Sequence, residues 1–137
     1  MKIRDIMTKD VEKVTPEQSI QAAAKLMSEA DCGSILVHDG DRLIGVLTDR
    51  DITLRAVADG LSPDTSVSDI MSDGVLYCFD DEDIQQVAEN MADISVRRLP
   101  VVDRDKRLVG IVSLGNFASC ANSNAGSTLL RGVAQAH

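Results

Sequence analysis

The sequence is poor in aromatic residues and has no tryptophan, so aromatic rings cannot dominate its core. Aromatics make up 2% of the 137 residues, whereas hydrophobic residues make up 44%. We therefore expect an aliphatic core of Val, Ile, Leu, Ala and Met. A chain of this length suits one compact domain, or two very small halves that share a core.

Cysteine is also scarce, and its spacing excludes the common thiol sites. Cys32, Cys78 and Cys120 form no CxxC pair and have no ligand-like spacing with His38 or His137. We expect reduced, largely buried thiols of a cytoplasmic protein and no metal site.

No apolar run approaches the roughly 20 residues that a membrane-spanning helix needs. The first ten residues lack the apolar stretch of a secretion signal. Acidic residues outnumber basic ones by 22 to 14, giving a net charge of −8. A field of that sign repels polyanions, so nucleic acid and anionic membranes are not expected partners.

The most informative feature present is an internal repeat. The tripeptide Asp5-Ile6-Met7 recurs as Asp69-Ile70-Met71, at an offset of 64 residues. After a one-residue insertion the offset becomes 65, which aligns Gly45 with Gly110. Further aligned pairs are Ile20 and Ile84, Ala24 and Ala88, Met27 and Met91, Val37 and Val102, and Leu43 and Leu108.

Each repeat has the pattern of one β-α-β-β-α unit. In the first, Thr15-Pro16-Glu17-Gln18 predicts a helix start with Thr15 as N-cap. Short apolar runs at 34–37 and 43–47 predict a hairpin, and a second helix is expected over 49–58. The apolar stripe of the first helix consists of Ile20, Ala23, Ala24 and Met27.

The second repeat predicts the same elements, with Asp80 as the cap of its first helix. The predicted fold is α+β, with the two repeats packed sheet to sheet about a pseudo-twofold axis. We divide the chain into repeat 1 (1–62, with the N-terminal segment), repeat 2 (63–120) and a loose C-terminal tail (121–137). Within that tail, residues 128–135 are compatible with a short helix that packs on a partner or frays.

The segment Gly45-Val46-Leu47-Thr48-Asp49-Arg50-Asp51 ends a strand and opens a helix. One interpretation is a capping box between Thr48 and Asp51, with no ligand. The same geometry also suits a nucleotide. A helix N-terminus favours phosphate, and a carboxylate one turn along can accept hydrogen bonds from a ribose diol.

The repeat, its Asp-Ile-Met openings, "GVLTDRD" and "VRRLPVVD" together resemble tandem CBS (cystathionine β-synthase) domains, the Bateman module, over roughly residues 3 to 118. The openings and "LTDRDI" are similar to stand-alone bacterial pairs related to hypoxic response proteins. The resemblance implies binding of AMP, ADP, ATP or a related adenosine ligand in the clefts between repeats. It also implies a homodimer.

The resemblance assigns site residues one by one. Thr48 and Asp51 correspond to the phosphate and ribose contacts of the family's G-h-x-T-x-x-D pattern. Arg97 and Arg98, just before "LPV", correspond to basic residues that meet phosphate. Backbone near three further residues would line the adenine slot, namely Val14, Thr15 and Pro16.

The second copy of the motif departs from the pattern. Ser113 replaces the threonine, and Asn116 replaces the ribose-binding aspartate. Because an amide lacks the charge that strengthens a carboxylate hydrogen bond, we expect a weaker or empty second site. Conversely, repeat 1 has Cys32-Gly33 where repeat 2 has the two arginines, so the best site would combine Asp51 and Thr48 with Arg97 or Arg98.

Other charged clusters have simpler interpretations. Arg104, Lys106 and Arg107 suit a solvated hairpin with local aspartate partners, and the acidic run 80–83 suits a helix start. No catalytic motif is visible, so an enzyme is not expected. The sequence favours a regulatory module that senses energy or stress state through an adenine nucleotide (AMP, or else ADP, ATP or NAD) and acts on an unidentified protein effector. The alternative is a structural or interaction protein that dimerises without productive nucleotide binding.

Overall fold

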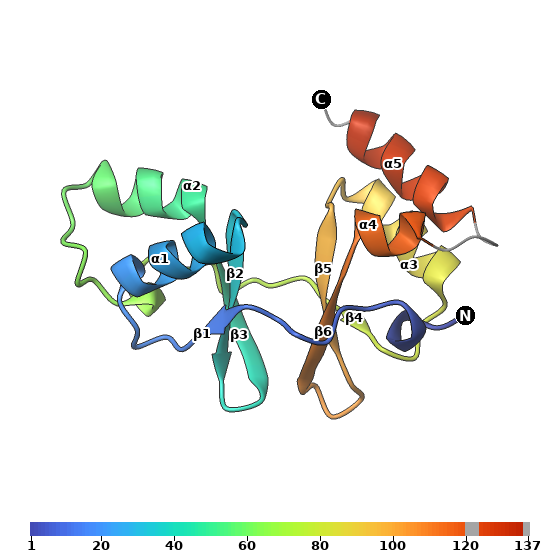
Figure 1. Cartoon of the computed structure of the whole chain (residues 1–137), viewed down its shortest axis with the longest axis horizontal. Coiled ribbons are helices and arrows are strands. Elements are labelled where there is room, and N and C mark those ends of the chain that lie inside the picture. The colour runs from blue at the N-terminus through green and yellow to red at the C-terminus, as the bar shows by residue number, and fades with distance from the viewer. Residues whose placement is uncertain (120–123, 136–137) are drawn as a thin grey trace. The chain divides into compact units, whose positions relative to one another are not determined.

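The computed structural model describes residues 1–119 and 124–135 and contains two copies of one mixed α+β unit (Figure 1). The first copy comprises β1 (Lys13–Val14), α1 (Ile20–Ala30), β2 (Ser34–Asp39), β3 (Arg42–Thr48), α2 (Asp49–Asp51) and the π-helical η2 (Ile52–Val57). The second comprises β4 (Cys78–Phe79), α3 (Ile84–Asp93), β5 (Arg98–Val102), β6 (Leu108–Ser113) and α4 (Leu114–Ala118). The remaining elements are η1 (Ile3–Asp5), η3 (Val67–Asp69) and α5 (Ala125–Gln135). The predicted β-α-β-β-α order is confirmed in both copies.

Each copy has its own three-stranded sheet with the same topology. The order is β1-β2-β3 in one sheet and β4-β5-β6 in the other. The short first strand is parallel to the second, and the second and third form an antiparallel hairpin. The duplication therefore extends from the sequence to strand order and direction.

Apolar side chains from helix and sheet form one core in each copy. In the first copy, α1 buries three residues of the predicted stripe, Ile20, Ala23 and Met27, whereas the fourth, Ala24, is exposed. The three buried residues belong to one cluster with Ile35 and Leu47 of the hairpin. Burying a side chain of this size contributes about 1.5–3 kcal/mol.

Helices α1 and α3 begin later than the sequence predicted. The N-cap of α1 is Ser19, whose Oγ accepts a hydrogen bond from Ala22 N at 3.1 Å, and that of α3 is Asp83. The predicted cap Thr15 instead opens a turn, in which its N–H donates to Gln18 Oε1 at 2.8 Å. In the second segment the corresponding turn contact lies one residue earlier than predicted: Phe79 N–H donates to Glu82 Oε2 at 3.0 Å, whereas Asp80 N–H donates to Val102 O at 2.9 Å. A side-chain acceptor three residues along satisfies a backbone donor in such a turn as it does at a helix start.

The opening segments pair with the opposite repeat, so the compact units of the structure do not coincide with the repeats defined by the sequence. Glu12–Val75 forms one compact unit, here called the repeat-1 unit. Met1–Val11 joins the chain from Leu76 onward in the other, the repeat-2 unit. The cause is backbone pairing: Thr8 pairs with Ile111 in one unit, and Ser72 pairs with Val46 in the other.

A methionine and a glycine meet at each of these pairings. In the repeat-1 unit, a Cβ on Gly45 would lie 2.6 Å from Met71 Sδ and 3.0 Å from Ser72 O. In the repeat-2 unit, a Cβ on Gly110 would lie 2.8 Å from both Met7 Sδ and Thr8 O. The Met of each Asp-Ile-Met opening therefore occupies the space that a glycine leaves on the opposite repeat's strand.

The C-terminal segment is ordered where it was predicted to be loose. Helix α5 packs on α3 and α4, and Ala125, Leu129 and Val133 are buried in the core of the repeat-2 unit. The helix considered over 128–135 is present as part of α5, which begins three residues earlier, at Ala125. The segment was predicted to be loose because residues 124–127 are small and polar, but the apolar spacing that matters begins at Ala125. The rest of the predicted tail, 121–123 and 136–137, lies outside the described residues. None of the described helices is long and apolar enough to cross a membrane.

We expect Gly45→Ala and Gly110→Ala each to destabilise the protein by about 1–3 kcal/mol, because the new methyl group overpacks the seat of a methionine and a carbonyl. Gly74→Ala is the matched control, since a Cβ there meets nothing within 4 Å. Urea denaturation measures the effect. Equal stability of all three variants would contradict the close packing described for the two openings.

Cys78 offers a second test, because burial suppresses its chemistry. Its side chain is buried in β4, and burial, followed by the nearby carboxylates of Glu82 and Asp80, raises the pKa of the thiol to about 12. At neutral pH it should therefore resist alkylation by iodoacetamide in the native state, whereas the half-buried Cys32 reacts. Peptide mass spectrometry reads the two positions separately. Alkylation of native Cys78 as fast as Cys32 would contradict its burial.

The raised pKa of Cys78 also predicts a pH dependence of stability. Since the unfolded thiol ionises at lower pH than the native one, the contribution of Cys78 to the free energy of unfolding should fall as the pH rises from about 9 to 12.

Candidate functional site

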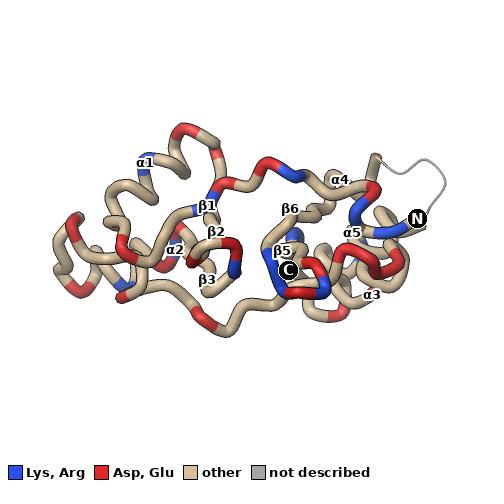
Figure 2. Tube along the Cα trace, turned by 90° about the horizontal axis from the view of Figure 1, so that it is seen from below, with Lys and Arg blue, Asp and Glu red and all other residues tan. Residues whose placement is uncertain are grey.

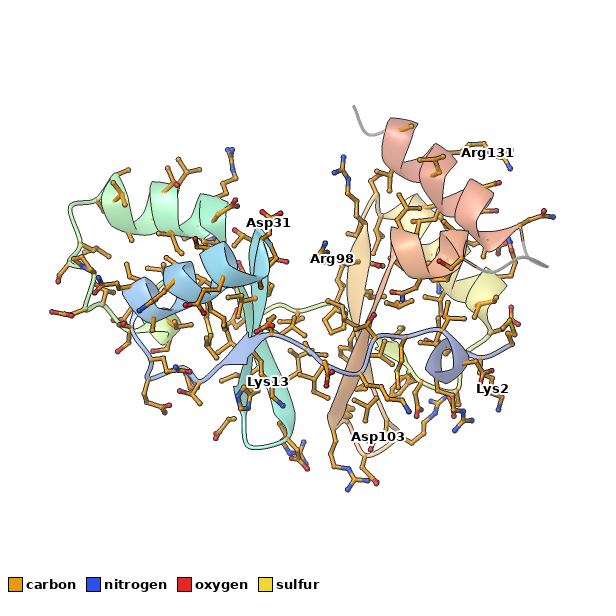
Figure 3. All side chains as sticks on the ribbon, in the orientation of Figure 1. Lys2, Lys13, Asp31, Arg98, Asp103 and Arg131 are labelled. Atoms are coloured by element: carbon orange, nitrogen blue, oxygen red, sulfur yellow. The ribbon has the colours of Figure 1, made fainter. Side chains whose placement is uncertain are left out.

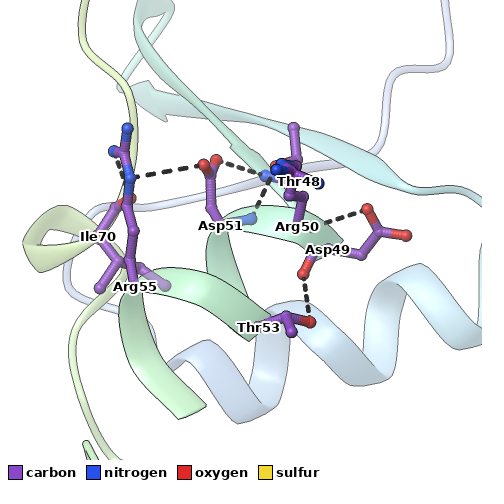
Figure 4. A network of polar contacts seen from close by, with 7 residues as sticks. All are labelled: Thr48, Asp49, Arg50, Asp51, Thr53, Arg55 and Ile70. Carbon is purple, nitrogen blue, oxygen red and sulfur yellow. Dashed lines mark hydrogen bonds and ion pairs between the residues drawn. The ribbon is translucent and has the colours of Figure 1, made fainter. Parts of the chain in front are cut away.

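The end of β3 and the start of α2 form a reciprocal cap (Figure 4). Asp51 N–H donates to Thr48 Oγ1 at 3.0 Å, and Thr48 N–H donates to Asp51 Oδ2 at 3.0 Å. The capping box predicted from the sequence is thus present. It fixes the rotamers of both side chains that the resemblance assigns to ligand binding.

Arg55 holds the same carboxylate from the next helical turn. Its Nε lies 3.8 Å from Asp51 Oδ1, and its Nη1 donates to Ile70 O at 3.2 Å. The side chain of Asp51 is only 14% exposed. The arginine therefore connects the carboxylate to the opening segment of repeat 2, a link that the sequence analysis missed. The i,i+4 spacing of Asp51 and Arg55 was the available signal.

The three residues assigned to an adenine slot lie in the same unit. Val14 is buried in β1, whereas Thr15 and Pro16 are half-buried in the turn that follows. The carbonyl of Pro16 accepts a hydrogen bond from Ser68 N at 3.0 Å. The backbone of this turn therefore already forms a hydrogen bond with the segment that carries the second Asp-Ile-Met opening.

Arg97 and Arg98 lie in the repeat-2 unit with exposed side chains, Arg97 just before β5 and Arg98 at its first position. Figure 3 labels Arg98. Within the part of the chain that the structure describes, neither guanidinium group has an ion pair. Arg98 is paired with Ser113 across the hairpin, and Arg97 O accepts from Leu114 N at 2.8 Å. The structure thus brings the arginines to the cap of their own repeat. Their predicted combination with Asp51, which belongs to the repeat-1 unit, stays a prediction.

That second cap has the same form and a different chemistry. Asn116 Oδ1 accepts from Ser113 N at 2.8 Å and from Ser113 Oγ at 2.9 Å. Asn116 Nδ2 donates to Thr8 Oγ1 at 3.3 Å. An amide oxygen has two lone pairs, and in Asn116 both already accept a hydrogen bond from Ser113. The carboxylate of Asp51 has two such oxygens, and only one hydrogen bond to it, from Thr48 N, is part of the cap.

The basic hairpin between β5 and β6 is a local ion-pair network, as predicted for Arg107. That side chain contacts Asp103 at 2.9 Å and Asp105 at 3.1 Å, and the charges alternate at this turn in Figure 2. Arg104 differs: it forms two hydrogen bonds with Asp81, at 2.8 and 2.7 Å, and lies 4.1 Å from the centre of the Phe79 ring. The hydrogen bond from Arg104 lowers the pKa of the Asp81 carboxyl.

The acidic run at 80–83 has structural contacts of the predicted kind. Asp83 caps α3, and Glu82 Oε2 accepts from Phe79 N at 3.0 Å. His38 Nδ1 lies 2.7 Å from Gly40 O, within its own turn. Among the described residues there is no group of three or more His, Cys, Asp or Glu side chains arranged to hold a metal ion.

Comparison with known proteins identifies the repeat. The model of the CBS domain matches residues 3–57 and again 67–121. A CBS domain-containing protein of Bacillus subtilis, YhcV, is 42% identical over 129 residues, covering 93% of this chain and 91% of its own length. Hypoxic response protein 1 of Mycobacterium tuberculosis is 39% identical over 117 residues, covering 84% and 81%.

Solved structures agree in fold. The crystal structure of Hypoxic Response Protein I, with two coordinated zinc ions, has a TM-score of 0.77 at 37% identity and covers 88% of this chain and 98% of its own. CBSX2 in complex with AMP has a TM-score of 0.72 at 29% identity, covering 84% and 91%. The CBS domain pair of MJ0100, in complex with 5′-methylthioadenosine and S-adenosyl-L-methionine, has a TM-score of 0.71 at 28% identity, covering 86% and 93%.

The duplicated fold, the repeated cap and these matches agree over nearly the whole described chain. This protein belongs to the CBS domain family and carries two CBS domains in tandem.

Proposed function

We propose that this chain is a non-catalytic regulatory module that binds an adenine nucleotide, with AMP as the first candidate and ADP, ATP or NAD as alternatives. The observation that carries the proposal is the fixed carboxylate of Asp51. Its position in the cap matches the ribose contact of the family motif, and two related structures hold adenosine ligands. Association of two copies and action on a protein effector belong to the same proposal.

The cap leaves Asp51 enough hydrogen-bonding capacity for a ribose. Each carboxylate oxygen can accept about two hydrogen bonds. Oδ2 accepts one from Thr48 N, and Oδ1 faces Arg55 at 3.8 Å, beyond good hydrogen-bond length. Both ribose hydroxyls can therefore donate to a carboxylate whose rotamer is already fixed, which lowers the entropy lost on binding.

Arg97 and Arg98 supply the charge that a phosphate needs. The chain as a whole carries −8 and repels anions at long range. Two neighbouring exposed guanidinium groups reverse the sign locally and can bind phosphate oxygens in a bidentate manner.

One observation favours the alternative of a structural or interaction protein. Asp51 and Asn116 each complete a capping box, and this structural role by itself accounts for their presence in the motif. Ligand binding by the intact chain separates the two functions.

In a thermal-shift assay, AMP at about 100 times its dissociation constant should stabilise the chain by about 2.7 kcal/mol. Asp51→Ala should abolish the shift, measured against that variant's own melting temperature, because the ribose loses its acceptor. Asp49→Ala is the matched control: it removes a neighbouring carboxylate that accepts a hydrogen bond from Arg50 N and should keep the shift.

If no adenosine ligand moves the melting temperature of the unmodified chain, the structural alternative replaces the proposal. If AMP stabilises the chain and Asp51→Ala responds equally, the binding site lies elsewhere.

The amide in the second cap leads to a prediction about the number of AMP sites per chain. We expect one strong AMP site per chain in calorimetry, and a second, measurable site after Asn116→Asp. The substitution turns the donor Nδ2 into an acceptor, while the other oxygen keeps its bond from Ser113 N. Asn116→Ala serves as the control, and an unchanged number of sites in Asn116→Asp would show that the acceptor at 116 does not limit binding.

A further inference from the structure

The two caps hold the same position in two chemical forms. Repeat 1 has Asp51 in its cap and Arg55 one helical turn later. By the offset of 65 residues, the corresponding positions of repeat 2 are Asn116 and Cys120, of which Cys120 lies outside the described residues. The acid and the base are therefore present together in one repeat, and an amide and a thiol replace both in the other.

Arg55 balances the charge of Asp51 without using its hydrogen-bonding capacity. Its Nε lies 3.8 Å from Asp51 Oδ1, which is close enough for Coulomb attraction but too long for a good hydrogen bond. The cap occupies one position on the other oxygen, where Oδ2 accepts from Thr48 N. The pair therefore carries no net charge, and the carboxylate still has acceptor positions for a ligand.

A second contact fixes the position of the guanidinium group. Arg55 Nη1 donates to Ile70 O at 3.2 Å, so the side chain extends from the carboxylate to the second Asp-Ile-Met opening (Figure 4). This anchor matters because the side chain of Arg55 is 53% exposed, and an exposed i,i+4 ion pair alone is loosely held. With the carbonyl as a second partner, the positive charge stays beside Asp51.

Repeat 2 makes the corresponding link without charge. Asn116 Nδ2 donates to Thr8 Oγ1 at 3.3 Å, and Thr8 belongs to the opening that pairs with β6. A carboxylate has no hydrogen to donate, so Asp51 cannot form such a contact by itself. In repeat 1 the link needs a donor from another residue, and Arg55 supplies both that donor and the balancing charge.

Charge balance at this position matters for a nucleotide, because its phosphate is attached to the same ribose that Asp51 would bind. Carboxylate and phosphate would then lie less than about 10 Å apart, which is within the Debye length at 0.1 M salt. Two negative charges at that separation repel each other, and the net charge of −8 adds to the effect. An acid in this position therefore favours an uncharged ligand unless a cation accompanies it.

We propose that Arg55 is a positioning residue: anchored on Ile70 O, it balances the charge of Asp51, so that an anionic nucleotide can bind with its ribose on a carboxylate. The inference rests on the nucleotide binding proposed above. It adds the residue that sets the preference of the site for phosphorylated over unphosphorylated adenosine ligands. Arg55 acts through Asp51 and differs in this from Arg97 and Arg98, which were assigned to the phosphate itself.

Isothermal titration calorimetry of the full chain with adenosine, AMP and ADP tests the proposal. In Arg55→Gln, the affinity for AMP should fall about five-fold more than that for adenosine, and the affinity for ADP more still, because the uncompensated carboxylate repels each added charge. The extra loss should shrink as the salt concentration rises. A purely structural role of Arg55 would instead weaken all three ligands by the same factor at every salt concentration.

Two further variants serve as rescue and control. Arg55→Lys retains the cation and should restore most of the AMP affinity that Arg55→Gln loses. Arg42→Gln is the matched control: it removes the same charge from an exposed arginine at the first position of β3, whereas Asp51 follows the end of that strand, and it should leave all three affinities unchanged. The melting temperature of each unliganded variant monitors its fold. Partial unfolding would lower the affinities for AMP and adenosine by the same factor, so their ratio still reports the role of Arg55.

The outcomes distinguish this inference from the proposed function. A chain that binds none of the three ligands overturns nucleotide binding and the role of Arg55 with it. A chain that binds them, while Arg55→Gln weakens all three equally or not at all, overturns the role of Arg55 alone. The same holds if Arg55→Lys behaves like Arg55→Gln, since a retained cation should retain the charge balance.

Discussion

The pairing of each opening segment with the third strand of the opposite repeat organises this molecule. Thr8 pairs with Ile111 and Ser72 with Val46, and in each case a methionine fills the space above a glycine. Because of this exchange, each compact unit is built from two separate parts of the chain. Neither repeat, taken as a continuous stretch of sequence, contains all of its own core: the buried Ile3 belongs to the cluster of repeat 2, and the buried Val67 to that of repeat 1.

The candidate site depends on the same arrangement. In repeat 1, Arg55 joins the carboxylate of Asp51 to Ile70 of an exchanged opening, and in repeat 2 the amide of Asn116 reaches Thr8 of the other opening. Each cap thus contacts the segment that the other repeat contributes. One scaffold holds two capping boxes, and the difference between a carboxylate and an amide decides how many hydrogen-bond acceptors remain unoccupied in each.

Helix α5 breaks the symmetry of the duplication. It gives repeat 2 a closed helical face whose core includes Leu129 and Val133, while repeat 1 keeps its counterpart open. Duplicated halves therefore differ in two independent respects, the chemistry of the cap and the cover of the helices.

Much of the local structure followed from the sequence. Both hairpins and the capping box at Thr48 were predicted because each depends on residues a few positions apart, and the number of repeats was predicted because identical residues recur at a constant offset. The two errors in helix starts were local in origin: the turns at Thr15 and at Phe79 satisfy a backbone donor with a side chain three residues along, as a helix start does. The order of elements and the capping box of Thr48 and Asp51 are therefore properties of the sequence by itself.

Tertiary structure decided what these spacings leave open. The two Asp-Ile-Met openings are identical, so either fits beside either strand, and only the folded chain shows that each pairs with the opposite repeat. The contact of Arg104 with Asp81 and Phe79 joins residues 23 or more positions apart, and α5 is stable because α3 and α4 bury its apolar side. Such contacts escape local patterns, because their free energy comes from surfaces that meet only when the chain has folded.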